Sequence, residues 1–153
     1  MDLIEGVRLK ALKPIPDERG RLMEIIRCDD EIFSKFGQVY MTTAYPGVVK
    51  AWHFHQYQDD YFTVLSGMMK IVLYDGREDS VSHGKINEFF LGVYNQQVLK
   101  IPSRVVHGFK CISETEAMVL NVTTEPYNYK EPDEQRIDPH TNHIDYDWNR
   151  EDG

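Results

Sequence analysis

The sequence of 153 residues predicts one all-β domain, a barrel or sandwich, with one short helix. Short runs rich in β-branched and aromatic residues alternate with a period of two, as strands do when one face is buried. Glycine and proline separate these runs at short intervals, which favours hairpin connections. A hydrophobic share of 41% is enough for a single core.

Turn residues separate the predicted strands along the chain. The predicted strands cover residues 37–43, 61–65, 68–74, 97–101 and 117–123. Turn signals stand between them at Pro46-Gly47, Ser66-Gly67, Asp75-Gly76, Pro102 and Pro126. Residues 29–36 are the predicted helix, because acidic residues precede the apolar Ile32, Phe33 and Phe36.

The two ends of the single domain, residues 1–153, have different predicted roles. Residues 1–13 form an apolar strand or arm that can join the sheet of a second copy or the edge of its own barrel, residues 14–127. Residues 128–153 are a polar tail that we expect to wrap the barrel in an ordered way. Its apolar anchors are Ile137, Ile144, Tyr146 and Trp148.

Composition excludes several classes of function. The 25 acidic and 17 basic side chains leave a net charge of -8, which argues against a nucleic-acid partner. No apolar run approaches the roughly 20 residues of a membrane span, and no leader pattern is visible, so we expect a cytoplasmic protein without a membrane partner. The two cysteines, Cys28 and Cys111, fit neither a disulfide framework nor a CxxC metal motif.

Histidines supply the candidate chemistry. His53 and His55 are two positions apart, so a strand places both imidazoles on one face. His107 follows Pro102, and the apolar neighbours that could wall a pocket are Trp52, Phe54 and Phe109. The other three histidines, His83, His140 and His143, lie in polar, turn-like surroundings and are expected at the surface.

Two spaced motifs extend this pattern. They are Gly47-x5-His53-x-His55-x4-Asp60-x6-Gly67 and Pro102-x4-His107-Gly-Phe109, and they resemble the two motifs of the cupin superfamily. Asp60 stands where cupins have Glu, and Arg104 where they have Gly. The resemblance implies a double-stranded β-helix, or jelly-roll barrel, with His53, His55, Asp60 and His107 converging inside it.

A narrower resemblance covers roughly residues 14 to 148. The motifs are Asp17-x-Arg19-Gly20 with Glu24, Lys50-Ala-Trp-His53, Ile101-Pro102-x4-His107-Gly108-Phe109, Asp138-Pro139 and Ile144-x-Tyr-x-Trp148, and they resemble dTDP-4-dehydrorhamnose 3,5-epimerases. That resemblance implies a homodimer that binds a dTDP-linked 4-keto sugar and requires no cofactor. It also implies that His53 is the catalytic base, that His107 is a second active-site histidine, and that Arg19 and Glu24 contact the nucleotide.

The chain departs from this family at positions that matter. Lys50 replaces a substrate-contacting arginine, and Asp60 replaces an active-site lysine. Leu120 stands where the family has the tyrosine proposed as its general acid. The substrate-binding candidates are Arg19, Glu24, Lys50, Asp60, Trp52 and Phe109. The candidates for the acid that returns the proton are His55, Tyr40 and Tyr127, in that order.

The expected reaction begins at the carbon beside a ketone. A C4 ketone acidifies the C3 hydrogen, and His53 as a neutral imidazole can remove it. The enolate needs a nearby positive charge or donor, which Lys50 or His107 can supply.

Three other hypotheses stay open. The His-x-His pair, the Val39-Tyr40 strand and the Val72-Leu-Tyr-Asp-Gly76 hairpin are similar to dTDP-4-keto-6-deoxyglucose 3,4-ketoisomerases. A metal cupin, a dioxygenase or isomerase, would use His53, His55, Asp60 and His107 as ligands of a divalent ion. A sugar-binding cupin without turnover is the third.

Overall fold

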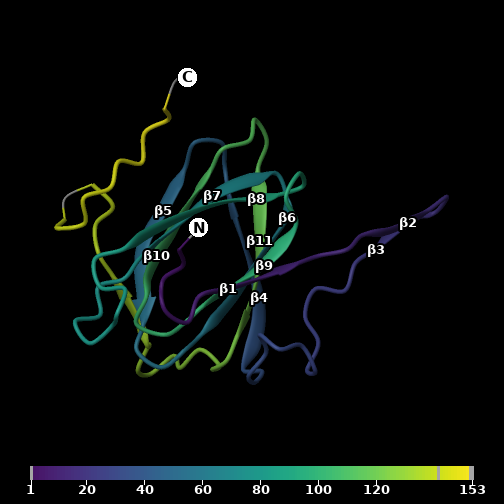
Figure 1. Cartoon of the computed structure of the whole chain (residues 1–153). Coiled ribbons are helices and arrows are strands. Elements are labelled where there is room, and N and C mark those ends of the chain that lie inside the picture. Colours follow the sequence, from purple (N-terminus) through teal and green to yellow (C-terminus); the bar gives the residue numbers. More distant parts are fainter. Residues whose placement is uncertain (1, 141, 152–153) are drawn as a thin grey trace.

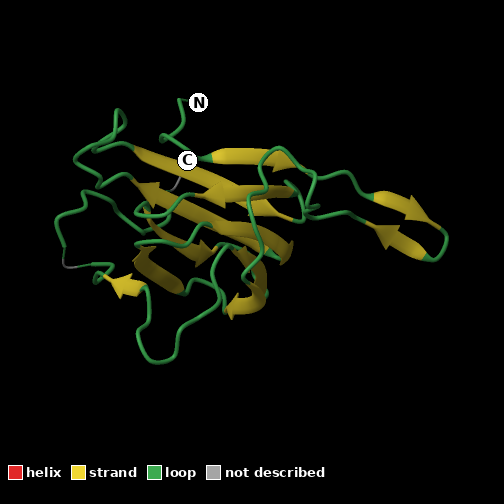
Figure 2. Ribbon diagram, turned by 90° about the horizontal axis from the view of Figure 1, so that it is seen from below, coloured by secondary structure: helices red, strands yellow, loops and turns green. Residues whose placement is uncertain are grey.

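The computed structural model describes residues 2–140 and 142–151. Within them the chain forms strands and no helix. Two five-stranded antiparallel sheets lie against each other, with strand orders β1-β9-β6-β11-β4 and β12-β5-β10-β7-β8 (Figure 1). This is the predicted all-β jelly-roll class. A separate two-stranded hairpin, β2-β3, extends away from the barrel (Figure 2).

Five of the strands have bounds close to the predicted ones, namely those at residues 38–44, 60–66, 68–74, 97–101 and 117–123. The first sheet contains β1 (Arg8–Ala11), β9 (Gln97–Ile101), β6 (Asp60–Ser66), β11 (Ala117–Thr123) and β4 (Gln38–Ala44). The second contains β12 (Glu134–Arg136), β5 (Val49–His55), β10 (Val106–Cys111), β7 (Met68–Tyr74) and β8 (Ile86–Gly92), and the hairpin is β2 (Ile15–Asp17) with β3 (Gly20–Leu22). The sequence predicted no bounds for β2, β3, β5, β10 and β12, and it missed β8, because Asn87 and Glu88 interrupt the apolar pattern of that strand.

The predicted helix over residues 29–36 is wrong, because side chains compete for the backbone groups of this segment. Turns occupy residues 28–32 instead. The Asp30 carboxylate accepts a hydrogen bond from the Arg27 backbone N–H at 2.8 Å and also pairs with Lys10. The Ser34 N–H donates to Tyr61 Oη at 3.0 Å. With no helix among the described residues, none of them lies in a helical membrane span.

The main core lies between the two sheets and includes the N-terminal segment. Its large members are Phe62, Met69, Ile71, Leu73, Phe89, Leu91, Leu99, Ile101 and Phe109. Ile4 and Val7 are 1% and 0% exposed in the same core, and β1 pairs with β9 of its own chain. Residues 8–11 are therefore an edge strand of their own barrel, the second of the two predicted roles for the arm.

A second cluster fastens the C-terminal tail to the outer face of β5, β7 and β10. Trp52 packs against Trp148 and Tyr146, with ring centroids 4.9 and 5.7 Å away. Lys70 Nζ lies 5.2 Å from the Tyr146 ring, and Lys110 Nζ donates to the Trp148 carbonyl at 2.7 Å. The predicted apolar anchors thus hold the tail in an ordered position.

Candidate active site

Two neighbouring strands bring the histidines together. His53 and His55 lie on β5, and His107 lies on β10, which pairs with β5 so that His107 stands opposite His53. The ring centroids of these two residues are 5.1 Å apart. The His-x-His spacing and the antiparallel register together place all three imidazoles at one place in the barrel.

Gly108 permits the close approach of these strands. A Cβ at this position would lie 2.2 Å from Ala51 Cβ and 2.9 Å from Ala51 Cα. The register also shifts between His107 and Phe109, which marks a bulge beside the site. The His-Gly-Phe motif therefore needs a glycine at this position, since any side chain there would push β10 away from β5.

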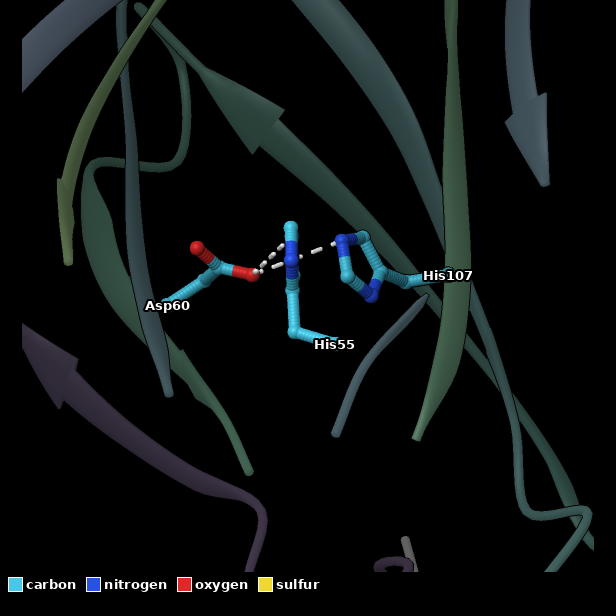
Figure 3. A group of neighbouring side chains, drawn as sticks. All are labelled: His55, Asp60 and His107. Carbon is cyan, nitrogen blue, oxygen red and sulfur yellow. Dashed lines mark ion pairs between the residues drawn. The ribbon is translucent and has the colours of Figure 1, made fainter. Parts of the chain in front are cut away.

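Asp60 reaches the histidines from the opposite sheet (Figure 3). Its Oδ2 lies 3.6 Å from His55 Nε2 and 3.5 Å from His107 Nε2. Its Oδ1 accepts hydrogen bonds from Gln58 Nε2 at 2.8 Å and from Asn121 Nδ2 at 2.7 Å. Ligand atoms of His55, Asp60 and His107 all lie within 4.8 Å of one another, a grouping that can hold a metal ion.

Burial favours the neutral form of His53 and of His107. It lowers the pKa of His53 to about 3, with the neighbouring His107 and His55 adding to the shift. Burial also lowers the pKa of His107 below its ordinary value, although the Asp60 charge acts in the opposite direction. A neutral imidazole has a free lone pair, which is the form that accepts a proton.

The cluster opens into a cavity of about 400 Å³. Its lining includes the three histidines, Phe62, Phe109, Lys50 and Arg136. A second cavity of about 330 Å³ adjoins it, since Tyr40, His55 and Glu134 line both. The second cavity presents the rings of Tyr127 and Tyr129, whose centroids are 5.0 Å apart.

Tyr40 lies on β4, in the sheet opposite to the one that carries His53. Its Oη accepts a hydrogen bond from Asn121 Nδ2 at 2.9 Å, and the same amide group donates to Asp60. Burial raises the pKa of Tyr40 to about 12, and the Asp60 charge adds to the shift. The phenol therefore keeps its proton at neutral pH, and Asn121 fixes its direction.

The structure places most of the predicted site residues at these two cavities. His53, His55, His107, Lys50, Phe109 and Tyr40 line the first, Asp60 lies directly behind it, and Tyr127 lines only the second. Trp52 is a correction. It lies with Tyr146 and Trp148 in the tail cluster and is 0% exposed, because successive side chains of a strand point to opposite faces.

Arg19 and Glu24 are not brought to either cavity within one chain. Arg19 sits at the turn of the β2-β3 hairpin, where it pairs with Asp17 at 2.5 Å. Glu24 is exposed after this hairpin and pairs with Arg27 at 3.2 Å.

Several site residues escaped sequence reasoning. Gln58 and Asn121 bind the Asp60 carboxylate, and Glu134 and Arg136 line the cavity from β12. Asn121 carries a usable signal, because it is a polar residue inside an otherwise apolar strand. Glu134 and Arg136 carry none, since β12 is a three-residue strand within a polar tail.

The remaining candidate groups behave largely as expected. His83, His140 and His143 are exposed, as predicted. Both cysteines are free thiols, with Cys111 buried and Cys28 exposed.

Comparison with known proteins gives relatives of nearly full length. The profile of the family described as dTDP-4-dehydrorhamnose 3,5-epimerase matches residues 2–152. The chain is 39% identical to the spore coat polysaccharide biosynthesis protein SpsL of Bacillus subtilis over 149 residues, covering 97% of this chain and 99% of that protein. It is 40% identical to a probable low-salt glycan biosynthesis epimerase of Haloferax volcanii over 153 residues, covering 99% and 98%.

Solved structures agree with this result. A dTDP sugar isomerase from Desulfovibrio desulfuricans is 35% identical, with a TM-score of 0.90 over 95% of this chain and 92% of that one. A dTDP-4-dehydrorhamnose 3,5-epimerase from Sulfolobus tokodaii is 26% identical, with a TM-score of 0.80 over 91% and 81%. With its barrel, histidine cavity and full-length profile match, the chain belongs to the dTDP-4-dehydrorhamnose 3,5-epimerase family of sugar isomerases.

Proposed function

We propose that the protein epimerises a dTDP-linked 4-keto-6-deoxy sugar during polysaccharide or glycan biosynthesis. The observation that carries the proposal is the neutral, mostly buried imidazole of His53 at the wall of a 400 Å³ cavity. Such a volume fits a sugar ring, and the family is one of isomerases acting on sugars. The two relatives of nearly full length are named for polysaccharide and glycan biosynthesis.

His53 is the proposed base. It removes the hydrogen at C3, and the electron pair moves into the C4 carbonyl to form an enolate. Lys50, at the edge of the cavity, and Arg136, which stands opposite His53 in the pairing of β12 with β5, bring positive charge to the anionic substrate. This proton transfer uses side chains of the chain itself and needs no cofactor.

Tyr40 is the proposed acid. It stands on the sheet opposite to His53, so a sugar between them has the base at one face and the phenol at the other. A proton removed at one face and returned at the other inverts the carbon. His55, on the same strand face as His53, would instead return a proton on the same side, as ketone migration requires.

We also propose that the enzyme acts as a homodimer. The β2-β3 hairpin leaves the barrel with Ile15 and Leu22 exposed by 55% and 59%. The edge strand β4 of the first five-stranded sheet exposes Val39 and Met41 by 52% and 57%. A second copy can cover both apolar surfaces and would bring Arg19 of the partner subunit toward the cavity. The cytoplasmic location remains a prediction from the sequence.

The first test is NMR with dTDP-4-keto-6-deoxyglucose in deuterated water. Deuterium at C3 with the ketone kept at C4 supports the epimerase, and deuterium at C5 as well makes it a double epimerase. A carbonyl signal that moves from C4 to C3 rejects the epimerase and supports the ketoisomerase. His53→Ala should abolish exchange, so wild-type exchange in this variant rejects the base assignment.

The dimer is tested by mixing two inactive variants, His53→Ala and Arg19→Ala. If Arg19 acts across the interface, mixed dimers regain one complete site and about a quarter of the activity returns. Light scattering that gives the mass of a monomer rejects the dimer.

A further inference from the structure

The side chain of Asn121 is buried, at 1% exposure, on the central strand β11. It stands directly opposite Tyr40 of β4, while β6 pairs with the other edge of β11. Its Oδ1 accepts a hydrogen bond from the Tyr61 backbone N–H at 3.2 Å. Its Nδ2 donates to Tyr40 Oη at 2.9 Å and to Asp60 Oδ1 at 2.7 Å. The carboxamide therefore has a partner for its oxygen and for both of its hydrogens.

These partners leave the Asn121 carboxamide one orientation. A backbone N–H can only donate, so the amide oxygen must face Tyr61. A turned amide would place its oxygen against the Asp60 carboxylate and its nitrogen against the N–H. With the nitrogen toward Tyr40 and Asp60, its two hydrogens supply one bond to each. Asn121 therefore holds the Tyr40 oxygen as an acceptor.

The Tyr40 hydroxyl keeps its own hydrogen for another partner. Asn121 occupies the side of Oη from which it donates, and no acceptor among the residues that the structure describes takes the hydroxyl hydrogen. Tyr40 is 40% exposed and lines both cavities. The cavity is thus the space in which this hydrogen can find an acceptor.

The same bond also favours the phenolate that forms when Tyr40 gives up its proton. Burial and the Asp60 charge raise the pKa of Tyr40, and the hydrogen bond from Asn121 acts in the opposite direction. During the transfer the O–H bond breaks, a C–H bond forms at C3, and the C4 carbonyl re-forms from the enolate. Water then returns a proton to the phenolate, whose charge the N–H donor stabilises until that happens.

We propose that Asn121 is the positioning residue that decides whether the enolate is inverted or returned. It makes Tyr40 a donor into the cavity, at the face opposite to His53. Without this bond the hydroxyl can turn its hydrogen toward position 121, and His53 gives the proton back to the face from which it came. This role rests on the proposed function, in which His53 is the base and Tyr40 the acid, and adds the residue that sets the stereochemical result.

Asn121→Asp reverses the hydrogen bond. An oxygen in place of Nδ2 carries at most one hydrogen, which the Asp60 carboxylate takes, so Tyr40 faces a lone pair and donates to it. NMR with dTDP-4-keto-6-deoxyglucose in deuterated water separates the two steps, because deuterium at C3 reports enolate formation and the configuration at C3 reports inversion. Inversion per exchange should fall about tenfold, while exchange stays detectable because His53 is unchanged.

Gln58→Glu is the matched control. Gln58 donates to the same oxygen of Asp60 at 2.8 Å but has no bond to Tyr40. The variant brings the same additional carboxyl group to Asp60, so it should slow exchange as Asn121→Asp does. Inversion per exchange should stay within about twofold of wild type, because the Tyr40 hydroxyl keeps its direction.

Two further variants complete the test. Tyr40→Phe removes the acid and should lower inversion per exchange about 100-fold. Adding Asn121→Asp to it should change this ratio no further, because Asn121 acts through Tyr40. Asn121→Ala adds no charge and guards against an aspartate variant that does not fold. It frees the hydroxyl without reversing it, so inversion per exchange should fall only about threefold.

Three results overturn the inference. They are Asn121 variants that invert per exchange like wild type, Gln58→Glu that loses inversion as strongly as Asn121→Asp, and a double variant that falls below Tyr40→Phe alone. The epimerase itself stands in these cases, since the wild type still exchanges and inverts. A wild type without exchange, or with its ketone moved to C3, rejects the proposed function, and the role of Asn121 falls with it.

Discussion

Asp60 and Asp75 are equally deeply buried, at 1% and 0% exposure, yet their surroundings are opposite. Asp75 accepts hydrogen bonds from Arg77 Nε at 2.7 Å and Nη2 at 2.9 Å, and from the hydroxyls of Ser80 and Ser82 at 2.6 and 2.5 Å. Asp60 has ordinary hydrogen bonds on one oxygen, while the other faces imidazoles at 3.5 Å or more.

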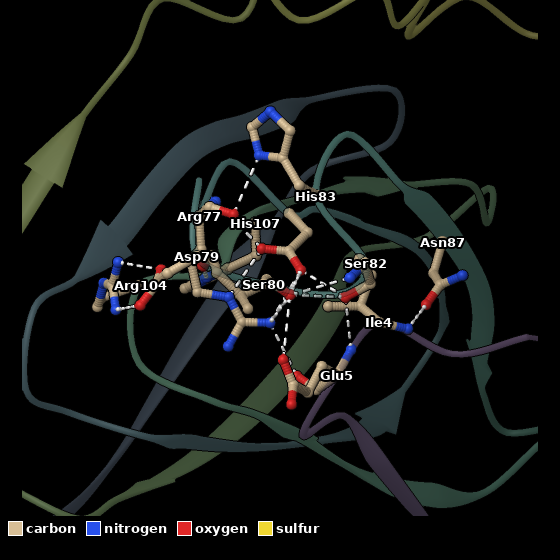
Figure 4. A network of polar contacts seen from close by, with 12 residues as sticks. Ile4, Glu5, Arg77, Asp79, Ser80, Ser82, His83, Asn87, Arg104 and His107 are labelled. Carbon is tan, nitrogen blue, oxygen red and sulfur yellow. Dashed lines mark hydrogen bonds and ion pairs between the residues drawn. The ribbon is translucent and has the colours of Figure 1, made fainter.

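Asp75, whose carboxylate has all its hydrogen bonds, stabilises the fold. Burial alone would raise the pKa of Asp75, but the hydrogen bonds from Arg77, Ser80 and Ser82 outweigh it and hold the pKa well below its usual range. The network continues to the N-terminal segment, since Ser82 Oγ accepts from the Glu5 N–H at 2.8 Å and Arg77 donates to the Glu5 carbonyl at 2.9 Å (Figure 4).

Burial of a carboxylate does not by itself mark an active site. A carboxylate with all its acceptor positions filled is a fixed structural charge, and it cannot exchange partners without a large cost. A carboxylate with one oxygen left to titratable or metal-binding groups can take part in chemistry. Four predictions test this difference.

The largest effect is expected for Asp60→Asn. The amide has the same shape and keeps the Gln58 and Asn121 bonds, so the free energy of unfolding should change by less than about 1 kcal/mol. Deuterium exchange at C3 should fall about 100-fold or more, because the charge beside the histidines is gone. The matched control, Asp59→Asn, removes a carboxylate that pairs with Lys100 at 3.2 Å and should keep exchange within about threefold.

Asp75→Asn should show the reverse. It leaves the Arg77 guanidinium, only 13% exposed, without its carboxylate partner, and should lower the free energy of unfolding by about 3 kcal/mol in urea denaturation. Exchange per folded molecule should equal that of wild type. A large loss of exchange with unchanged stability would contradict the structural role of this network.

Gly108→Ala should disturb both properties moderately. The new methyl group would lie 2.2 Å from Ala51 Cβ, so β10 must move from β5, with a loss of about 1–3 kcal/mol in unfolding free energy. Exchange should fall as well, since His107 and His53 lie on the separated strands. Adding Ala51→Gly should restore part of both, and a single variant as stable as wild type would show that the strands are not in close contact.

The smallest effect is expected for the pH dependence of the stabilisation that Asp75 gives to the folded protein. Because the folded pKa of Asp75 is below the unfolded value of about 3.9, its stabilisation is complete above that value and is lost progressively as the pH falls from there toward the folded pKa. The difference in unfolding free energy between wild type and Asp75→Asn should shrink below pH 4 by at most about 1.4 kcal/mol per pH unit. Urea denaturation from pH 7 to 3 measures it, and a constant difference would contradict the ion pair.

The parts of the fold and site that could be predicted from the sequence are those that follow a local pattern of apolar and polar residues. The bounds of β7, β9 and β11 follow directly from their apolar runs, because side chains of a strand alternate with a fixed period. The same period puts His53 and His55 on one face. The strand that carries Asn87 and Glu88 was missed, since its buried asparagine accepts from the Ile4 N–H at 2.8 Å, a partner 83 positions away.

The sequence by itself determined the all-β class, the family and the identity of the three cavity histidines, because these depend on short-range periodicity and spaced motifs. Only the tertiary structure decided which partners meet. It brought Asp60 and Asn121 to the histidines from the opposite sheet, turned Trp52 to the tail, and replaced the predicted helix with turns held by Asp30 and Tyr61. Contacts between distant segments depend on register and sheet packing, which no local pattern encodes.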